Sequence, residues 1–166
     1  MKKTVYMFFA VMYLIFGASF VMAASAKEKQ IDNNDKVVRF LQDSKVFYIA
    51  TIDGDKPRVR PFGAVLNIDG KVSICTGAFK NVYKQIEQNP NVEISAMSAD
   101  GKWIRVSGSL TNITNEANQK KFFEAMPNLE KIYSGDKKKD FTVLSFKSGT
   151  ATIEDMTGNK EVIELK

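Results

Sequence analysis

Two arginines stand two residues apart in the segment 'KPRVRPFG', at positions 58 and 60. The segment has the composition of a β-strand, in which side chains alternate between two faces, so Arg58 and Arg60 would share one face about 7 Å apart. Two guanidinium groups at that distance repel each other unless solvent or an anion lies against them. Pro61 has no N–H to give to a neighbouring strand, which places this point at an edge or a bulge. The pattern leaves two interpretations, a pair of solvated arginines or one wall of an anion site.

A second segment, 'TGAFKN' at residues 76–81, favours the anion site. It leads into a predicted helix from Lys80 to Gln88, which Asn89 and Pro90 would end. The unpaired N–H groups at a helix start favour phosphate. Lys80 and Lys84 lie one turn apart on this helix and would reinforce a site for a dianion.

Trp103 is the third residue that needs a partner. In 'KWIRVSG' the apolar side chains of Ile104 and Val106 point to one face of a strand, which leaves Trp103 and Arg105 on the polar face. A tryptophan there is explained by a surface groove, by a planar ligand or by a second subunit.

The elements that would position these residues are mostly short strands. Strands are predicted at residues 46–52, 58–68, 71–76, 92–99, 102–114, 141–146, 150–156 and 161–165. Helices are predicted at 35–42, with Asn33 or Asn34 as N-cap, at 80–88 and at 115–126, where Phe122 would face the core. Asp-Gly pairs predict tight turns that join the first three strands into a meander, and Ser148-Gly149 and Gly158-Asn159 would separate the last three.

This alternation predicts a mainly β protein with a few helices, built as an antiparallel barrel or sandwich. The core is expected to contain Ile49, Val72, Ile74, Ile104 and Val106. Residues 136–140, 'DKKKD', are interpreted as a solvated loop.

Composition sets further limits. With 166 residues and 44% hydrophobic content, the chain can build one ordinary domain. A net charge of +5 is too small to argue for nucleic acid. The chain has no histidine, which excludes histidine-based catalysis and histidine-ligated metal or haem. The single cysteine, Cys75, excludes an internal disulfide or thiolate cluster and is interpreted as a buried strand residue.

The first 26 residues have the layout of a secretory signal. Lys2 and Lys3 precede an apolar run over residues 5–22, and small residues follow. Cleavage is expected after Ala23 or Ala26, and an uncleaved membrane anchor is the alternative. In either case the domain, residues 27–166, is expected outside the cytoplasm.

From about residue 35 to residue 165 the chain resembles the pyridoxamine 5'-phosphate oxidase-like, flavin-binding split-barrel proteins, particularly their short members. The resemblance rests on the segments 'FYIATIDGDKPRVRPFG', 'ICTGAFKNVYKQIEQNPNVEIS', 'DGKWIRVSG', 'LEKIYSG' and 'FTVLSF', which occur in the family's order and cover nearly the whole chain after the signal. It implies a Greek-key-like split β-barrel that forms a homodimer and binds FMN in clefts between the subunits.

The resemblance also implies roles for particular residues. The strand along the flavin would contain Arg60, Pro61, Phe62 and Gly63, with Arg58 as an additional cation. The phosphate would lie on Thr76, Lys80 and the adjacent Asn81, and the partner subunit would present Trp103, with Arg105 nearby.

Departures from the family limit what can be carried over. Oxidation of pyridoxamine phosphate is not expected, because that activity depends on a C-terminal segment with Arg and His, whereas this chain ends at Lys166 and has no His. Three functions stay open: an exported FMN-dependent oxidoreductase acting on a small substrate, a non-catalytic flavin carrier or electron-transfer module, and a split barrel that binds another ligand, such as a deazaflavin or haem, or none. In the first, the flavin would supply the chemistry and the protein its orientation.

Overall fold

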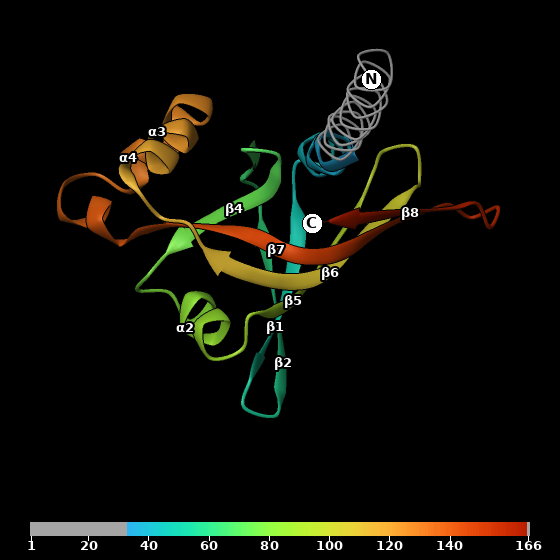
Figure 1. Ribbon diagram of the computed structural model, residues 1–166, viewed down its shortest axis with the longest axis horizontal. Helices are drawn as coiled ribbons and strands as arrows, with labels where there is room; N and C mark the ends of the chain where they lie inside the picture. Colours follow the sequence, from blue (N-terminus) through green and yellow to red (C-terminus); the bar gives the residue numbers. More distant parts are fainter. Residues whose placement is uncertain (1–32, 166) are drawn as a thin grey trace, which may run out of the picture.

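The fold is an antiparallel β-barrel with helices packed around it, seen in a computed structural model that describes residues 33–165 (Figure 1). A first helix covers residues 33–43. The strands are β1 (Phe47–Asp53), β2 (Lys56–Phe62), β3 (Val65–Ile68), β4 (Lys71–Gly77), β5 (Asn91–Met97), β6 (Trp103–Asn112), β7 (Phe141–Glu154) and β8 (Lys160–Leu165). The helices are α2 (Asn81–Gln88), α3 (Glu116–Ala125), α4 (Pro127–Ile132) and the 3-10 helix η1 (Gly135–Asp140). The predicted signal, residues 1–26, lies outside the described residues.

The strands form one sheet in the order β2-β1-β5-β6-β7-β4-β3, and β8 pairs with β7. Every described pairing is antiparallel. The prediction of a mainly β, antiparallel split barrel with a few helices is therefore confirmed. In Figure 1 the β1–β2 hairpin projects below the body of the molecule, while α3 and α4 lie together on one side.

The predicted strand over residues 58–68 is wrong, because the chain divides it into β2 and β3. β2 ends at Phe62, whose ring packs 6.0 Å from that of Phe47, and the next residue, Gly63, passes close to the backbone of Lys45. β2 pairs with β1, whereas β3 pairs with β4 at the other end of the strand order. The first strands thus form two separate hairpins, and the predicted meander is wrong.

The predicted turn at Ser148-Gly149 is also wrong, because β7 runs without interruption from Phe141 to Glu154. Gly149 lies directly opposite Gly108 of β6, next to a β-bulge at Ser109 and Leu110. A Cβ on Gly108 would lie 2.3 Å from the Ser148 carbonyl oxygen, and one on Gly149 would lie 2.4 Å from that of Ser107. Gly149 therefore allows the backbones of β6 and β7 to approach closely next to the bulge, and it does not reverse the chain direction.

Two smaller predictions need correction. Asn33 and Asn34 lie within the first helix, so neither is its N-cap. The Asn34 side chain is buried and donates to the Gly70 carbonyl oxygen at 2.5 Å, which ties the helix to the β3–β4 turn. Residues 136–140 belong to η1 and are not an irregular loop, although η1 is largely exposed.

The core has two parts. The larger fills the barrel and includes all five predicted core residues, each at most 1% exposed: Ile49, Val72, Ile74, Ile104 and Val106. The smaller lies under α3 and α4 on the outer side of β4 and β7, where Phe122 and Phe141 meet edge to face at 6.1 Å. The prediction that Phe122 faces the core is confirmed. None of the helices within residues 33–165 is long and apolar enough to cross a membrane.

The glycine pair gives a stability prediction. Gly108→Ala is expected to lower the free energy of unfolding by about 2–3 kcal/mol, since the new methyl group would force the β6 and β7 backbones apart. Urea unfolding measures this, with Thr111→Ala, an exposed change on the same strand, as the control. Equal unfolding midpoints for the two variants would contradict the role given to the glycine pair.

Candidate functional site

A cavity of about 260 Å³ lies where β2, the end of β4 and α4 meet. Twelve residues line it: Arg60, Pro61, Phe62, Gly63, Ala64, Cys75, Thr76, Lys80, Val82, Leu129, Ile132 and Tyr133. We call it the β2–β4 pocket. Six of the ten residues predicted from the sequence to bind a cofactor are in this lining, and Asn81 follows directly as the first residue of α2. The segment that contains Arg60 and the segment that contains Thr76 and Lys80 thus line the same pocket, as expected if they form one anion site.

The Thr76 hydroxyl is the most unusual atom of the pocket. Thr76 is 2% exposed, and within the described part of the chain its Oγ1 is the buried side-chain oxygen or nitrogen that has no hydrogen-bond partner. A buried polar group without a partner costs about 1–3 kcal/mol. Because Thr76 lines a cavity, a ligand bound there with hydrogen-bonding oxygens would supply the partner that the described chain does not.

The start of α2 offers further donors next to Thr76. Its N-cap residue, Lys80, makes no side-chain capping bond, and the first turn has no acidic residue. In α3, by contrast, the Asn115 side chain accepts from the Asn118 N–H at 2.8 Å. The first N–H groups of a helix have no acceptor within the helix and carry a partial positive charge. At the start of α2 the N–H groups of Lys80 and Tyr83 donate to the carbonyl oxygens of Gly77 and Lys80, which leaves those of Asn81 and Val82 available to an anion.

The two arginines of β2 have different surroundings. Arg58 lies outside the pocket lining and makes an ion pair with Asp53, with Nη2 3.0 Å from Oδ2. Arg60 lies in the lining and donates from Nη1 to Thr51 Oγ1 at 2.7 Å and from Nη2 to Gln85 Oε1 at 2.6 Å. Within the described residues Arg60 has no carboxylate partner, so its charge stays uncompensated.

Lys80 is the second cation of the pocket. Its Nζ lies 6.0 Å from the ring centre of Phe79 and 5.7 Å from that of Tyr133, and no ion pair of the described chain includes it. The lining contains no carboxylate. Burial raises the pKa of the neighbouring Cys75 thiol to about 12, although Lys80 acts in the opposite direction. Cys75 is therefore a neutral wall residue at physiological pH, in agreement with its interpretation as a buried strand residue.

Six residues of the pocket were not among the predicted site residues, and three of them, Ala64, Cys75 and Val82, are neighbours of predicted ones in the sequence. Leu129, Ile132 and Tyr133 come from α4 and its C-terminal end. The signal in the sequence was the segment 'LEKIYSG', which belongs to the resemblance but carries no charge pattern that would assign it to an anion site.

Trp103 and Arg105 lie outside the pocket, on the outer face of the sheet. Trp103 is half-buried and donates from Nε1 to Glu154 Oε2 at 3.1 Å, and Arg105 donates to Glu93 at 2.8 Å. The pairing registers place several exposed apolar side chains on this same face: Tyr48, Ile52, Val59 and Met97. We call these residues, together with Trp103, the outer apolar face.

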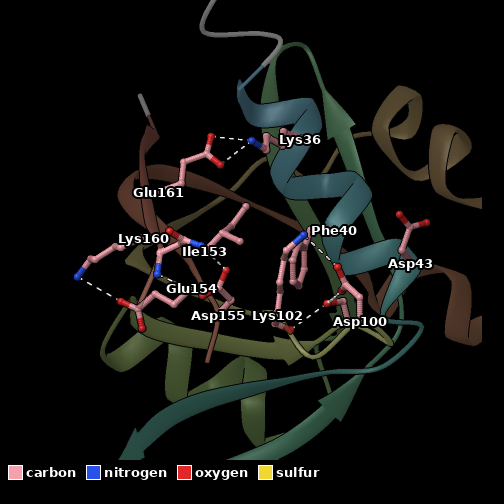
Figure 2. A pocket seen from close by; sticks show the side chains of 12 residues that line it. Lys36, Phe40, Asp43, Asp100, Lys102, Ile153, Glu154, Asp155, Lys160 and Glu161 are labelled. Carbon is pink, nitrogen blue, oxygen red and sulfur yellow. Dashed lines mark hydrogen bonds and ion pairs between the residues drawn. The ribbon is translucent and has the colours of Figure 1, made fainter. Parts of the chain in front are cut away.

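A larger groove of about 510 Å³ lies between the first helix, the β5–β6 turn and β8 (Figure 2). Its three lysines already have carboxylate partners: Lys36 with Glu161, Lys102 with Asp100, and Lys160 with Glu154. Four donors of Thr157 and Asn159 surround the Asp155 carboxylate and lower its pKa to about 2. The lysines of this groove are thus neutralised by carboxylates, in contrast with the two cations of the β2–β4 pocket.

No group of three or more Cys, Asp or Glu side chains within residues 33–165 is placed to hold a metal ion.

Comparison with solved structures supports a common fold. A NimC/NimA family protein from Clostridium acetobutylicum is 40% identical to this chain, with a TM-score of 0.79 over 84% of this chain and 96% of that one. General stress protein 26 from Bacillus anthracis is 18% identical, with a TM-score of 0.62 over 81% and 98%. A heme binding protein from Mycobacterium smegmatis is 12% identical, with a TM-score of 0.59 over 75% and 57%. The last two show likeness of fold alone.

No curated protein matches the chain. The family comparison, however, extends over most of it, because residues 33–153 match the pyridoxamine 5'-phosphate oxidase family. These residues contain β1 to β6, nearly all of β7 and the whole β2–β4 pocket. The chain therefore belongs to the pyridoxamine 5'-phosphate oxidase family.

Proposed function

We propose that this protein binds FMN, with the phosphate in the β2–β4 pocket and the ring between two copies of the chain, and acts as an exported flavin-dependent oxidoreductase on a small substrate. The observation that carries the proposal is the buried Thr76 hydroxyl, which has no partner among the described residues, in a residue that lines a pocket with two cations and no carboxylate.

The pocket fits a phosphate monoester. Such a group carries a charge of about −1.5 to −2 at pH 7 and three strong acceptor oxygens. Thr76, Lys80, Arg60 and the first N–H groups of α2 are all donors, and two of them are full cations. Phosphate at this position would also complement the helix dipole of α2.

The pocket of one chain does not fit a whole flavin mononucleotide. At about 260 Å³ its volume is below the range of about 300–1,000 Å³ that is typical of ligand sites. The remaining contacts would come from a second copy, docked through the outer apolar face, where Val59 is 63% and Met97 is 60% exposed. Since Trp103 and Arg105 lie on that face, pairing would bring the partner subunit's Trp103 into the site.

When bound, the flavin would supply hydride or electron transfer. The residues of this chain would bind the phosphate, orient the ring and exclude water, with Phe62 and Pro61 as apolar wall and Trp103 as a stacking surface. The name of the Mycobacterium relative makes haem a possible ligand of this fold, but this chain has no histidine to bind the iron. A flavin carrier without catalysis would use the same residues, and turnover with candidate electron donors separates it from an enzyme.

Truncation of the phosphate ligands tests the site. Lys80→Ala and Arg60→Ala are each expected to weaken FMN binding roughly tenfold to a hundredfold, since each removes a charge-assisted contact. Thr76→Val should weaken it less, because a neutral hydroxyl is lost. Quenching of flavin fluorescence measures the dissociation constants. Lys56→Ala, which removes one charge from the exposed start of β2, is the control for net charge.

If the Lys80 and Arg60 variants bind FMN as tightly as the wild-type protein, the site assignment is refuted. If the Lys56 variant loses as much FMN affinity as they do, the loss reflects net charge and not the pocket.

A charge on the outer apolar face tests the second copy. Val59→Asp is expected to convert a dimer into a monomer and to weaken FMN binding at least about tenfold, because it buries an unpaired carboxylate in the proposed interface. Sedimentation velocity and flavin titration measure the two effects. The matched control is Met156→Asp in the turn between β7 and β8, where the wild-type methionine is 82% exposed and outside this face. A wild-type monomer at micromolar concentration that still binds FMN would refute the shared site.

A further inference from the structure

Arg60 is held by two neutral acceptors that are themselves buried. Thr51 is 2% exposed and Gln85 is 5% exposed. Thr51 donates its hydroxyl hydrogen to Gln85 Oε1 at 2.8 Å, so the three side chains form a closed hydrogen-bonded triangle. The triangle joins β1, β2 and α2, and α2 is the helix whose first turn faces the pocket.

The chemistry of the triangle fixes the orientation of the Gln85 amide. A guanidinium group has only donors, so the amide oxygen, and not the NH₂ group, must face Arg60. The two bonds occupy Nη1 and Nη2 of Arg60, one N–H from each, which leaves three of its five N–H donors for a ligand. The side chain is therefore oriented before any ligand arrives, while part of its hydrogen-bonding capacity stays free.

We propose that Thr51 and Gln85 are positioning residues that fix Arg60 without neutralising it, and that this makes the pocket select a phosphate monoester over the same ligand without phosphate. The inference rests on the proposed FMN function for the identity of the ligand. It goes beyond that function because neither residue lines the pocket.

The comparison with Arg58 explains why the acceptors are neutral. Arg58 is fixed by a carboxylate, Asp53, and an ion pair of this kind cancels most of the charge that an approaching anion would feel. An amide and a hydroxyl give Arg60 the same restriction of side-chain freedom but leave the full positive charge. On one face of β2, therefore, the charge of Arg58 is neutralised by a carboxylate and the charge of Arg60 is not.

Replacing Gln85 by glutamate separates position from charge. Gln85→Glu keeps the size and the acceptor oxygen but places a carboxylate against Arg60, so FMN affinity should fall roughly tenfold to a hundredfold. The affinity for riboflavin, which lacks the phosphate, should not change, and the salt dependence of FMN binding should decrease. Gln88→Glu makes the same charge change at an exposed position on α2 and serves as the control.

Thr51 provides a second, independent variant. Thr51→Val keeps the shape of the side chain and removes one acceptor of Arg60, so FMN should bind severalfold more weakly while riboflavin binding is unchanged. Thr51→Ser keeps the hydroxyl, so the ratio of its FMN affinity to its riboflavin affinity should equal that of the wild-type protein. A merely structural role would lower the affinities for both flavins together and would not respond to the serine.

The outcomes distinguish the two proposals. Unchanged FMN affinity in Gln85→Glu, or equal losses for FMN and riboflavin, would overturn the positioning role. If wild-type protein binds neither flavin, the proposed function is wrong, and thermal stabilisation by inorganic phosphate then tests the inference separately. If phosphate stabilises the wild-type protein but not Gln85→Glu, the positioning role is upheld. If phosphate does not stabilise the wild-type protein, the positioning role is overturned.

Discussion

The close backbone contact between Gly108 of β6 and Gly149 of β7 is the constraint on which the rest of the fold depends. It lets β7 bend and continue for 14 residues, so that one strand pairs with β6, with β4 and with β8. The first half of β7 contributes Phe141 and Val143 to the smaller core and Leu144 and Phe146 to the barrel core, and the second half contributes Ala151 and Ile153 to the barrel core. Both halves of the split barrel are thus joined by a single strand.

That strand also positions the candidate site. Its first residues pair with the end of β4, where Thr76 lies opposite Thr142 and Gly77 opposite Phe141. The next residue, Ala78, donates its N–H to the Asp140 carbonyl oxygen at 2.7 Å. These bonds fix the chain just before α2 begins, which determines where Lys80 and the free N–H groups of α2 point. The pairing of β7 with β4 therefore positions the pocket, although β7 itself does not line it.

Local patterns predicted most elements and brought Arg60 and Lys80 forward as candidates for one anion site. The apolar alternation on β6 placed Ile104 and Val106 in the core and Trp103 on the other face, and the Asn-Pro pair marked the end of α2. The failures concern residues whose role depends on distant partners. Gly149 was interpreted as a turn because a glycine that permits close approach has the same local signature as a turn glycine. The division between β2 and β3 was missed because both halves have strand composition and differ only in their partners. Gln85 was predicted only as part of a helix, since nothing in its neighbours shows that it reaches Arg60.

Three features of the molecule depart from the usual rules of a stable fold, and all three meet in one pocket. A buried hydroxyl at Thr76 lacks a partner, the first turn of α2 lacks a cap, and Arg60 lacks a counter-charge among the described residues. Comparable groups elsewhere in the described chain are satisfied: α3 is capped by Asn115, Arg58 and Arg105 have carboxylates, and the lysines of the larger groove are paired. Polar or charged groups that lack a partner within the protein are often found where a ligand supplies the partner. Each of these three groups would be stabilised by a negative charge or by an acceptor oxygen. One phosphate group would supply both to all three, which is why an anion explains the pocket better than three separate defects would.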